Sequence, residues 1–188
     1  AAVGIEKARW MAPVDPPREY VSPLSVEELK AINKSILADY EAAIRVHPKC
    51  AEAWCNRGNI RQLRDDFAGA IGDYSHALHL QPRLVNAWVN RGAARHMRGE
   101  NDAAIEDLTK AILLNSHASG AHFNRALAYQ AKADWKNALS DLSHVIERDG
   151  KNVETRVLRA SIRRKSGDPG GAIEDCTEAI RLDPMNKD

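Results

Sequence analysis

The sequence predicts an all-α solenoid, a stack of helical hairpins that share one continuous core. The main observation is a repeat of 34 residues in the placement of small side chains. It runs through Gly58, Gly92, Ala126 and Ala160, and again through Ala70, Ala104, Ala138 and Ala172. A second observation is the low aromatic content of 5%, which suits close packing of helices through small residues. A unit of this length cannot bury its own apolar face, so the copies must stack.

Residues 1–24 differ from the rest of the chain, because several prolines there prevent a continuous helix. The prolines are Pro13, Pro16, Pro17 and Pro23. Large apolar residues accompany the prolines, with Trp10 before the first of them and Tyr20 between the last two. A disordered spacer would normally carry fewer such residues. We expect an extended tail that lies across a surface, either of its own solenoid or of a partner.

Residues 25–48 predict one long helix that caps the N-terminal end of the stack. Ser25 and Glu28 have the spacing of a capping box, in which each side chain satisfies an unpaired backbone amide. Apolar residues follow at helical spacing as far as His47 and Pro48. The second half of this segment matches the second half of each later repeat, so the segment is also a partial repeat.

Four full repeats follow, at 51–84, 85–118, 119–152 and 153–186. Each is expected to form two helices, here called helix A and helix B, joined by a short turn. In the first repeat, helix A is predicted at about 51–64 and helix B at about 67–81. Gly99 and Gly167 lie at the A-to-B turn of two repeats, where glycine readily adopts a positive φ.

Within the first repeat, the order and spacing of seven residues resemble the signature of the tetratricopeptide repeat. They are Trp54, Gly58, Phe67, Ala70, Tyr74, Ala77 and Pro82. The resemblance covers roughly residues 36–186, with four copies in register. His122 and Arg156 replace the tryptophan, and Ser116 and Gly150 replace the final proline. The resemblance implies a right-handed superhelix whose A helices line a concave groove, and a function in binding other proteins.

Asparagine occupies the sixth place of three consecutive repeats, at Asn56, Asn90 and Asn124. Along the groove these amides would form a ladder, and an amide can both donate to and accept from a peptide backbone. The arrangement is similar to the asparagine ladder in the repeat domain of the O-linked N-acetylglucosamine transferases. In the alternative interpretation, asparagine before Arg-Gly only caps or spaces helix A.

Other groove residues predict a polar start, an apolar middle and a basic end. Asn59 lies at the start, Phe123 and Leu127 lie in the middle, and Arg163 and Arg164 lie at the end. A ligand with an apolar anchor followed by acidic residues would fit this order. This chain matches poorly the repeat domains that hold the C-terminal carboxylate of chaperones, so that ligand is not expected. Asn59 and Asn90 match their asparagine places, but Cys55, Gly120 and Asn124 stand at their cationic places.

Arginine recurs at the seventh place of every repeat, and aspartate recurs with the same period on the B helices. The residues are Arg57, Arg91, Arg125 and Arg159, with Asp39, Asp73, Asp107, Asp141 and Asp175. The arginines could form an anion-binding stripe, but matching periods of opposite charge favour ion pairs between helices. Arg57 could pair with Asp73 of its own repeat or with Asp39 of the preceding helix.

Several other functions find no support in the sequence. It contains no nucleophile–base arrangement or phosphate-binding loop, and His76 and His79 lack a third metal ligand, so we expect no catalysis, cofactor or metal. A net charge of +1 gives no basis for general nucleic-acid binding. No apolar run approaches the roughly 18 residues that cross a bilayer. Three cysteines without framework spacing indicate free thiols in a reducing intracellular compartment, cytoplasmic or organellar.

The predicted function is therefore a non-catalytic protein-interaction module that binds an extended peptide or a partner helix in its groove. One alternative is a permanent structural subunit of a large assembly. The other is the substrate-recruiting part of a longer enzyme.

Overall fold

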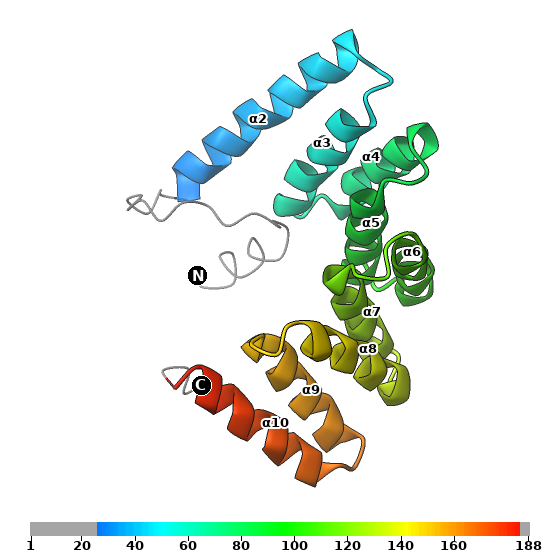
Figure 1. Cartoon of the computed structure of the whole chain (residues 1–188). Helices are drawn as coiled ribbons and strands as arrows, with labels where there is room; N and C mark the ends of the chain where they lie inside the picture. The colour runs from blue at the N-terminus through cyan, green and yellow to red at the C-terminus, as the bar shows by residue number, and fades with distance from the viewer. Residues whose placement is uncertain (1–25, 185–188) are drawn as a thin grey trace. The chain divides into compact units, whose positions relative to one another are not determined.

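A computed structural model describes residues 26–184, with side chains from residue 35 onward. All regular structure in these residues is α-helical (Figure 1). The helices are α2 (Val26–Val46), α3 (Ala51–Leu63), α4 (Phe67–Leu80), α5 (Val85–Met97), α6 (Asn101–Leu114), α7 (Ser119–Ala131), α8 (Trp135–Arg148), α9 (Val153–Lys165) and α10 (Pro169–Leu182). The tail predicted for residues 1–24, and Ser25 of the predicted capping box, lie outside the described residues.

Each A-to-B turn closes with a residue in the left-handed conformation at the fifteenth place of its repeat. Gly99 and Gly167 have φ of 80° and 88°, as their position in the sequence predicted. Asp65 and Ala133 take the same conformation, at φ of 60° and 57°. The turn geometry is therefore common to all four repeats, whether or not glycine is present.

Helix B begins with an aspartate cap in three repeats. Asp66, Asp134 and Asp168 accept hydrogen bonds from backbone amides of the first helical turn, at 2.9, 3.2 and 2.9 Å. These contacts satisfy one of the amides that a helix start leaves unpaired. Glu100, at the same place in the second repeat, makes no such bond.

Contacts divide the chain inside α5 into two compact bodies, an N-terminal body up to Ala94 and a C-terminal body from Arg95. In the N-terminal body, α2 packs on α3 and α3 packs on α4 (Figure 1). Its core holds the fully buried Ala70, Tyr74 and Ala77 of α4, with Ala87 and Ala94 of α5. The four alanines of this core let the helix backbones approach closely.

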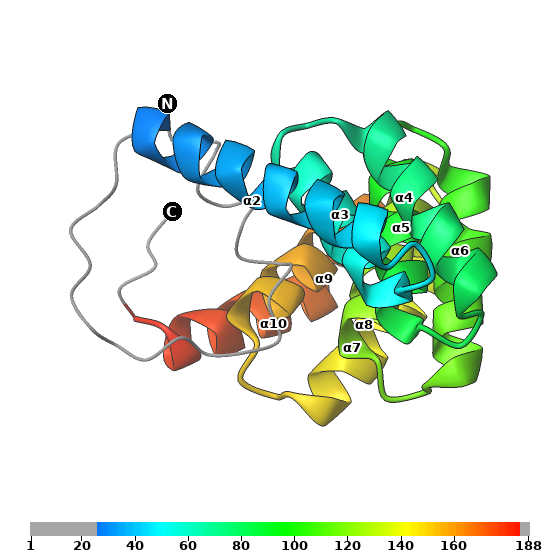
Figure 2. The ribbon, with the colours of Figure 1, turned by 90° about the horizontal axis from the view of Figure 1, so that it is seen from above.

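The C-terminal body packs its helices in chain order from α6 to α10. Figures 1 and 2 both show α9 alongside α10. Ala126, Ala138, Leu142 and Ile162 form a buried cluster that joins α7, α8 and α9. The core thus continues from one hairpin into the next, as expected for repeats that cannot bury an apolar face alone.

Candidate protein-interaction surface

The best-defined polar feature is a pair of asparagines on neighbouring A helices of the N-terminal body. Nδ2 of Asn90 on α5 donates to Oδ1 of Asn59 on α3 at 2.8 Å. The hydroxyl of Tyr74 lies 2.9 Å from the same oxygen and 2.9 Å from Oε1 of Gln62. Because that hydroxyl has one proton, it donates to one of the two oxygens at a time.

This network fixes which way the two amides point. Oδ1 of Asn59 faces its two donors, so its Nδ2 faces away from them. Within the described part of the chain, neither Nδ2 of Asn59 nor Oδ1 of Asn90 has a hydrogen-bond partner. Burial raises the pKa of Tyr74 well above its ordinary value, so the phenol stays protonated and remains a donor. We call Asn59 and Asn90 the asparagine pair.

The two other predicted rungs of the ladder are not linked to this pair. Asn56 is exposed on α3 and Asn124 is half-buried on α7. Among the described residues, neither amide makes a hydrogen bond. Asn124 belongs to the C-terminal body, so a ladder of three asparagines stays a prediction.

The predicted apolar residues lie on α7 and are only partly covered. Phe123 is half-buried and packs against the cluster of Ala126, Ala138, Leu142 and Ile162. Leu127, one turn further along the helix, is also half-buried. Phe123 thus contributes to the core of the C-terminal body as well as to its surface.

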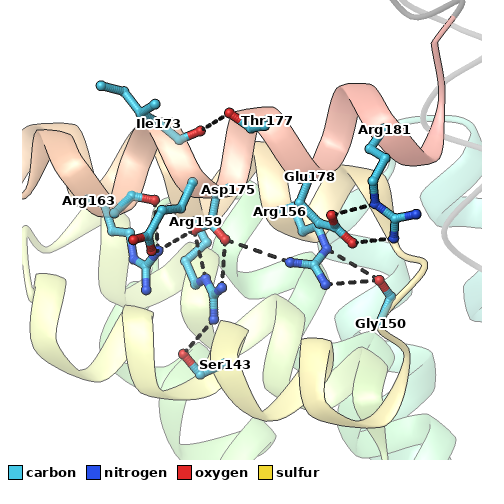
Figure 3. Close-up of polar contacts among 12 residues, drawn as sticks. Ser143, Gly150, Arg156, Arg159, Arg163, Ile173, Asp175, Thr177, Glu178 and Arg181 are labelled. Atoms are coloured by element: carbon cyan, nitrogen blue, oxygen red, sulfur yellow. Dashed lines mark hydrogen bonds and ion pairs between the residues drawn. The ribbon is translucent and has the colours of Figure 1, made fainter.

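The predicted basic residues of α9 have different surroundings. Nη1 of Arg163 donates to the carbonyl oxygen of Gly171 at 2.8 Å and lies 3.0 Å from Oδ2 of Asp175 (Figure 3). Arg164 is exposed. Arg163 therefore holds α9 to α10, and Arg164 is the more accessible cation.

Two other arginines bind helix B in the same way as Arg163. The sequence analysis did not predict this role. Arg61 and Arg95 stand at the same eleventh place of their repeats and bind the aspartate and a carbonyl of their own helix B. The repetition of arginine at this place was the signal that could have revealed the contact. Tyr129 replaces it in the third repeat.

The seventh-place arginines Arg57, Arg125 and Arg159 form the ion pairs that their periodicity predicted. Arg57 binds Asp73 through two hydrogen bonds of 3.0 and 2.7 Å, and Arg125 binds Asp141 through two of 2.8 Å. Arg159 binds Asp175 at 2.9 and 2.6 Å (Figure 3). Each pair lies within one hairpin, so the Arg57–Asp73 alternative is correct. These bonds raise the pKa of Arg57 and Arg125, against the effect of burial.

The same arginines also bind the preceding hairpin, a contact that the sequence analysis did not find. Nη1 of Arg91 donates to Oγ of Ser75, that of Arg125 to Oγ1 of Thr109, and that of Arg159 to Oγ of Ser143, each at 3.0 Å. The hydroxyl always comes from the twenty-fifth place of the previous repeat. Serine or threonine recurring at that place was the available signal.

No metal centre is evident in the described residues. They contain no group of three or more histidine, cysteine, aspartate or glutamate residues that could hold an ion. His76 instead stacks on Trp54, with ring centroids 3.9 Å apart. Cys50, Cys55 and Cys176 are all free thiols. None of the described helices is both long enough and apolar enough to cross a bilayer.

Comparison with known proteins agrees with this architecture. Residues 37–83 and residues 153–186 each match a family model described as Tetratricopeptide repeat. Among curated proteins, none matches the sequence.

Solved structures of similar fold cover most of the chain. A crystal structure of MamA shares 17% identity, covers 87% of this chain and 97% of its own, and superposes with a TM-score of 0.76. MamA 41-end from Desulfovibrio magneticus RS-1 shares 15% identity, covers 85% and 90%, and gives a TM-score of 0.78. YrrB, described as a TPR protein with an unusual peptide-binding site, shares 19% identity, covers 84% and 81%, and gives a TM-score of 0.71.

The stacked hairpins define the class of the protein as an all-α solenoid. The two family matches show tetratricopeptide repeats at residues 37–83 and 153–186, and the fold is that of the solved tetratricopeptide-repeat structures.

Proposed function

We propose that the chain is a non-catalytic protein-interaction module that binds an extended segment of a partner polypeptide through its A helices. The observation that carries this proposal is the asparagine pair, whose orientation is set before any ligand arrives. Asn59 offers an amide donor and Asn90 offers a carbonyl acceptor, on adjacent A helices.

One donor and one acceptor are what a peptide unit needs from a binding surface. Nδ2 of Asn59 would donate to a peptide carbonyl, and Oδ1 of Asn90 would accept from a peptide amide. Tyr74 and the bond between the two asparagines hold both groups in place, which reduces the entropy lost on binding. Each hydrogen bond should contribute about 0.5–1.5 kcal/mol, so the pair orients a peptide more than it determines affinity.

Further contacts are proposed separately for the other predicted residues. Asn56 on α3 would add a third amide in the N-terminal body. In the C-terminal body, Asn124, Phe123 and Leu127 on α7 offer an amide beside partly exposed apolar groups. Arg164 on α9 would attract acidic residues of a ligand, and Arg163 would contribute mainly through its charge.

The experiment begins with selection of binders to the full chain from a displayed library of random 12-residue peptides. The affinity of a selected, fluorescein-labelled peptide is then measured by fluorescence polarisation for the unmodified chain, N59A and N90A. We expect each substitution to weaken binding about three- to tenfold, in line with the loss of one hydrogen bond. Gln81→Ala, which removes an exposed amide in the turn after α4, is the matched control and should leave affinity unchanged.

Circular dichroism of each variant checks that the helices are intact. If the library yields no binder, or if selected peptides bind N59A and N90A as well as the unmodified chain, the assignment of this surface is wrong.

A further inference from the structure

One side of α10 exposes the apolar residues that the preceding hairpins cover. Ile173 and Ile180 are 67% and 61% exposed. Their counterparts on α8 are Leu139, which is half-buried, and Ile146, which is 9% exposed. These two residues are less exposed because α9 packs on α8. The exposed side of α10 is thus the continuation of an interface that the structure already contains.

Thr177 lies on the same side of α10. Its hydroxyl makes one of the two hydrogen bonds that the hydroxyl at the same place of an earlier repeat makes. In the N-terminal body, Ser75 donates to the carbonyl oxygen of Ile71 at 2.7 Å and accepts from Arg91 at 3.0 Å. Thr177 likewise donates to the carbonyl oxygen of Ile173 at 2.7 Å. None of the described residues donates to its Oγ1. Figure 3 shows Thr177 and Ile173 on the side of α10 that faces away from Ser143 and Gly150.

The helices that cover the equivalent sides share a simple signature. Each has a small or apolar residue, an arginine four positions later and another small or apolar residue three positions after that. The sets are Ala87, Arg91 and Ala94 on α5, then Ala121, Arg125 and Ala128 on α7, then Thr155, Arg159 and Ile162 on α9. The flanking residues of all three sets are fully buried, so they form the contact itself.

We propose that the face of α10 formed by Ile173, Cys176, Thr177 and Ile180 is a docking site for an α-helix of a partner protein with this signature. The partner's arginine would donate to Oγ1 of Thr177, and its small residues would pack on Ile173 and Ile180. The surface is distinct from the asparagine pair, and it recognises a folded helix rather than an extended segment.

The described helices of a second copy of this chain do not fit as the occupant. Its helices α5, α7 and α9 have the signature, but their arginines are already bound to the hydroxyl of the preceding hairpin. Arg57 on α3 is bound to Asp73, and α2 packs on that helix. Among the described helices, none that has the signature can therefore offer its arginine without leaving its own hairpin.

The test uses the full chain and two synthetic probes. The first probe is a 20-residue alanine-rich helical peptide that carries the signature, with one arginine and with alanine at the two flanking signature positions. The second has glutamine in place of that arginine. Binding is followed by amide chemical shifts of residues 173–181 and by the rate at which iodoacetamide alkylates Cys176, which is exposed and adjacent to Thr177.

We expect the arginine peptide to shift these amides, to slow alkylation of Cys176 and to bind about tenfold more tightly than the glutamine peptide, the effect of one charged hydrogen bond. In Thr177→Val, which keeps the shape but lacks the hydroxyl, the two peptides should bind equally. Ile173→Asp should abolish binding, whereas N59A should not change it.

The proposal fails if the unmodified chain binds both peptides equally or if the shifts lie on another helix. It also fails if sedimentation shows that the chain self-associates and Ile173→Asp prevents this, because the occupant is then a second copy.

Discussion

Gly58 lies directly against the ring of Tyr74: a Cβ at Gly58 would come within 2.7 Å of Cε1 of that ring. The ring is fully buried, and its hydroxyl is engaged with Asn59 and Gln62. The absence of a side chain at Gly58 therefore lets α3 and α4 approach, and indirectly positions the asparagine pair.

Gly58→Ala should lower the free energy of unfolding by about 1–3 kcal/mol, because the ring or the helix must move. Gly72→Ala is the matched control on α4, where no atom lies within 4 Å of the added carbon. That change should raise stability by up to about 1 kcal/mol through helix propensity. Urea unfolding measures both variants, and equal effects would show that the contact with Tyr74 does not constrain the helices.

Asp141→Asn should destabilise the C-terminal body. The carboxylate is 4% exposed and binds Arg125 through two bonds of 2.8 Å and Nδ1 of His122 at 2.8 Å. Loss of its charge leaves the Arg125 guanidinium partly buried without a counter-ion, which should cost about 3 kcal/mol.

The control for this prediction is Asp102→Asn, which removes an exposed ion pair with Lys132. Surface pairs of this kind contribute at most about 1 kcal/mol. Denaturant unfolding of both variants distinguishes the two cases, and a loss for Asp141→Asn as small as that for Asp102→Asn would refute the structural role of the buried carboxylate.

Cys55 and Cys176 should differ strongly in reactivity. Burial, helped by the nearby charge of Glu52, raises the pKa of Cys55 to about 11, whereas Cys176 is exposed. At pH 8 only about one Cys55 thiol in a thousand is then ionised, and the thiolate is the reactive form. Iodoacetamide should modify Cys176 first.

Peptide mass mapping of a time course at pH 8 measures which cysteine is alkylated first. The control is the same reaction in guanidinium chloride, because unfolding should remove the difference in rate between the two cysteines. Raising the pH toward 11 should increase the ionised fraction of Cys55. Equal rates for the two cysteines at pH 8 in the folded chain would contradict the burial of Cys55.

The sequence predicted the hairpins well because the repeat period and the small residues carry most of the information. Helix A of the first repeat was expected at about 51–64 and helix B at about 67–81, and the structure has Ala51–Leu63 and Phe67–Leu80. The left-handed turn was recognised at Gly99 and Gly167 alone. Asp65 and Ala133 adopt it because the turns of their repeats require it. Aspartate is more frequent than most residues in this conformation, whereas alanine has no such preference.

The candidate site was harder to predict, because periodicity places a residue on a helix without choosing its partner. Asp39 and Asp73 are one period apart, so the sequence could not decide which of them binds Arg57. The bond between Asn59 and Asn90 depends on the spacing of two helices. The engagement of Arg163 with Asp175 depends on how α9 and α10 pack.

The seventh-place arginines bind their own hairpin more strongly than they bind the preceding hairpin. In the C-terminal body, Arg125 and Arg159 each make a bidentate bond to an aspartate of their own hairpin, but a single bond to a neutral hydroxyl of the hairpin before. Both bonds have a charged donor, but the bond to the aspartate is bidentate and also has a charged acceptor, so it is the stronger of the two. Under mechanical load, the interfaces between hairpins should therefore separate before the two helices of a hairpin do. The C-terminal body should then deform mainly between its hairpins.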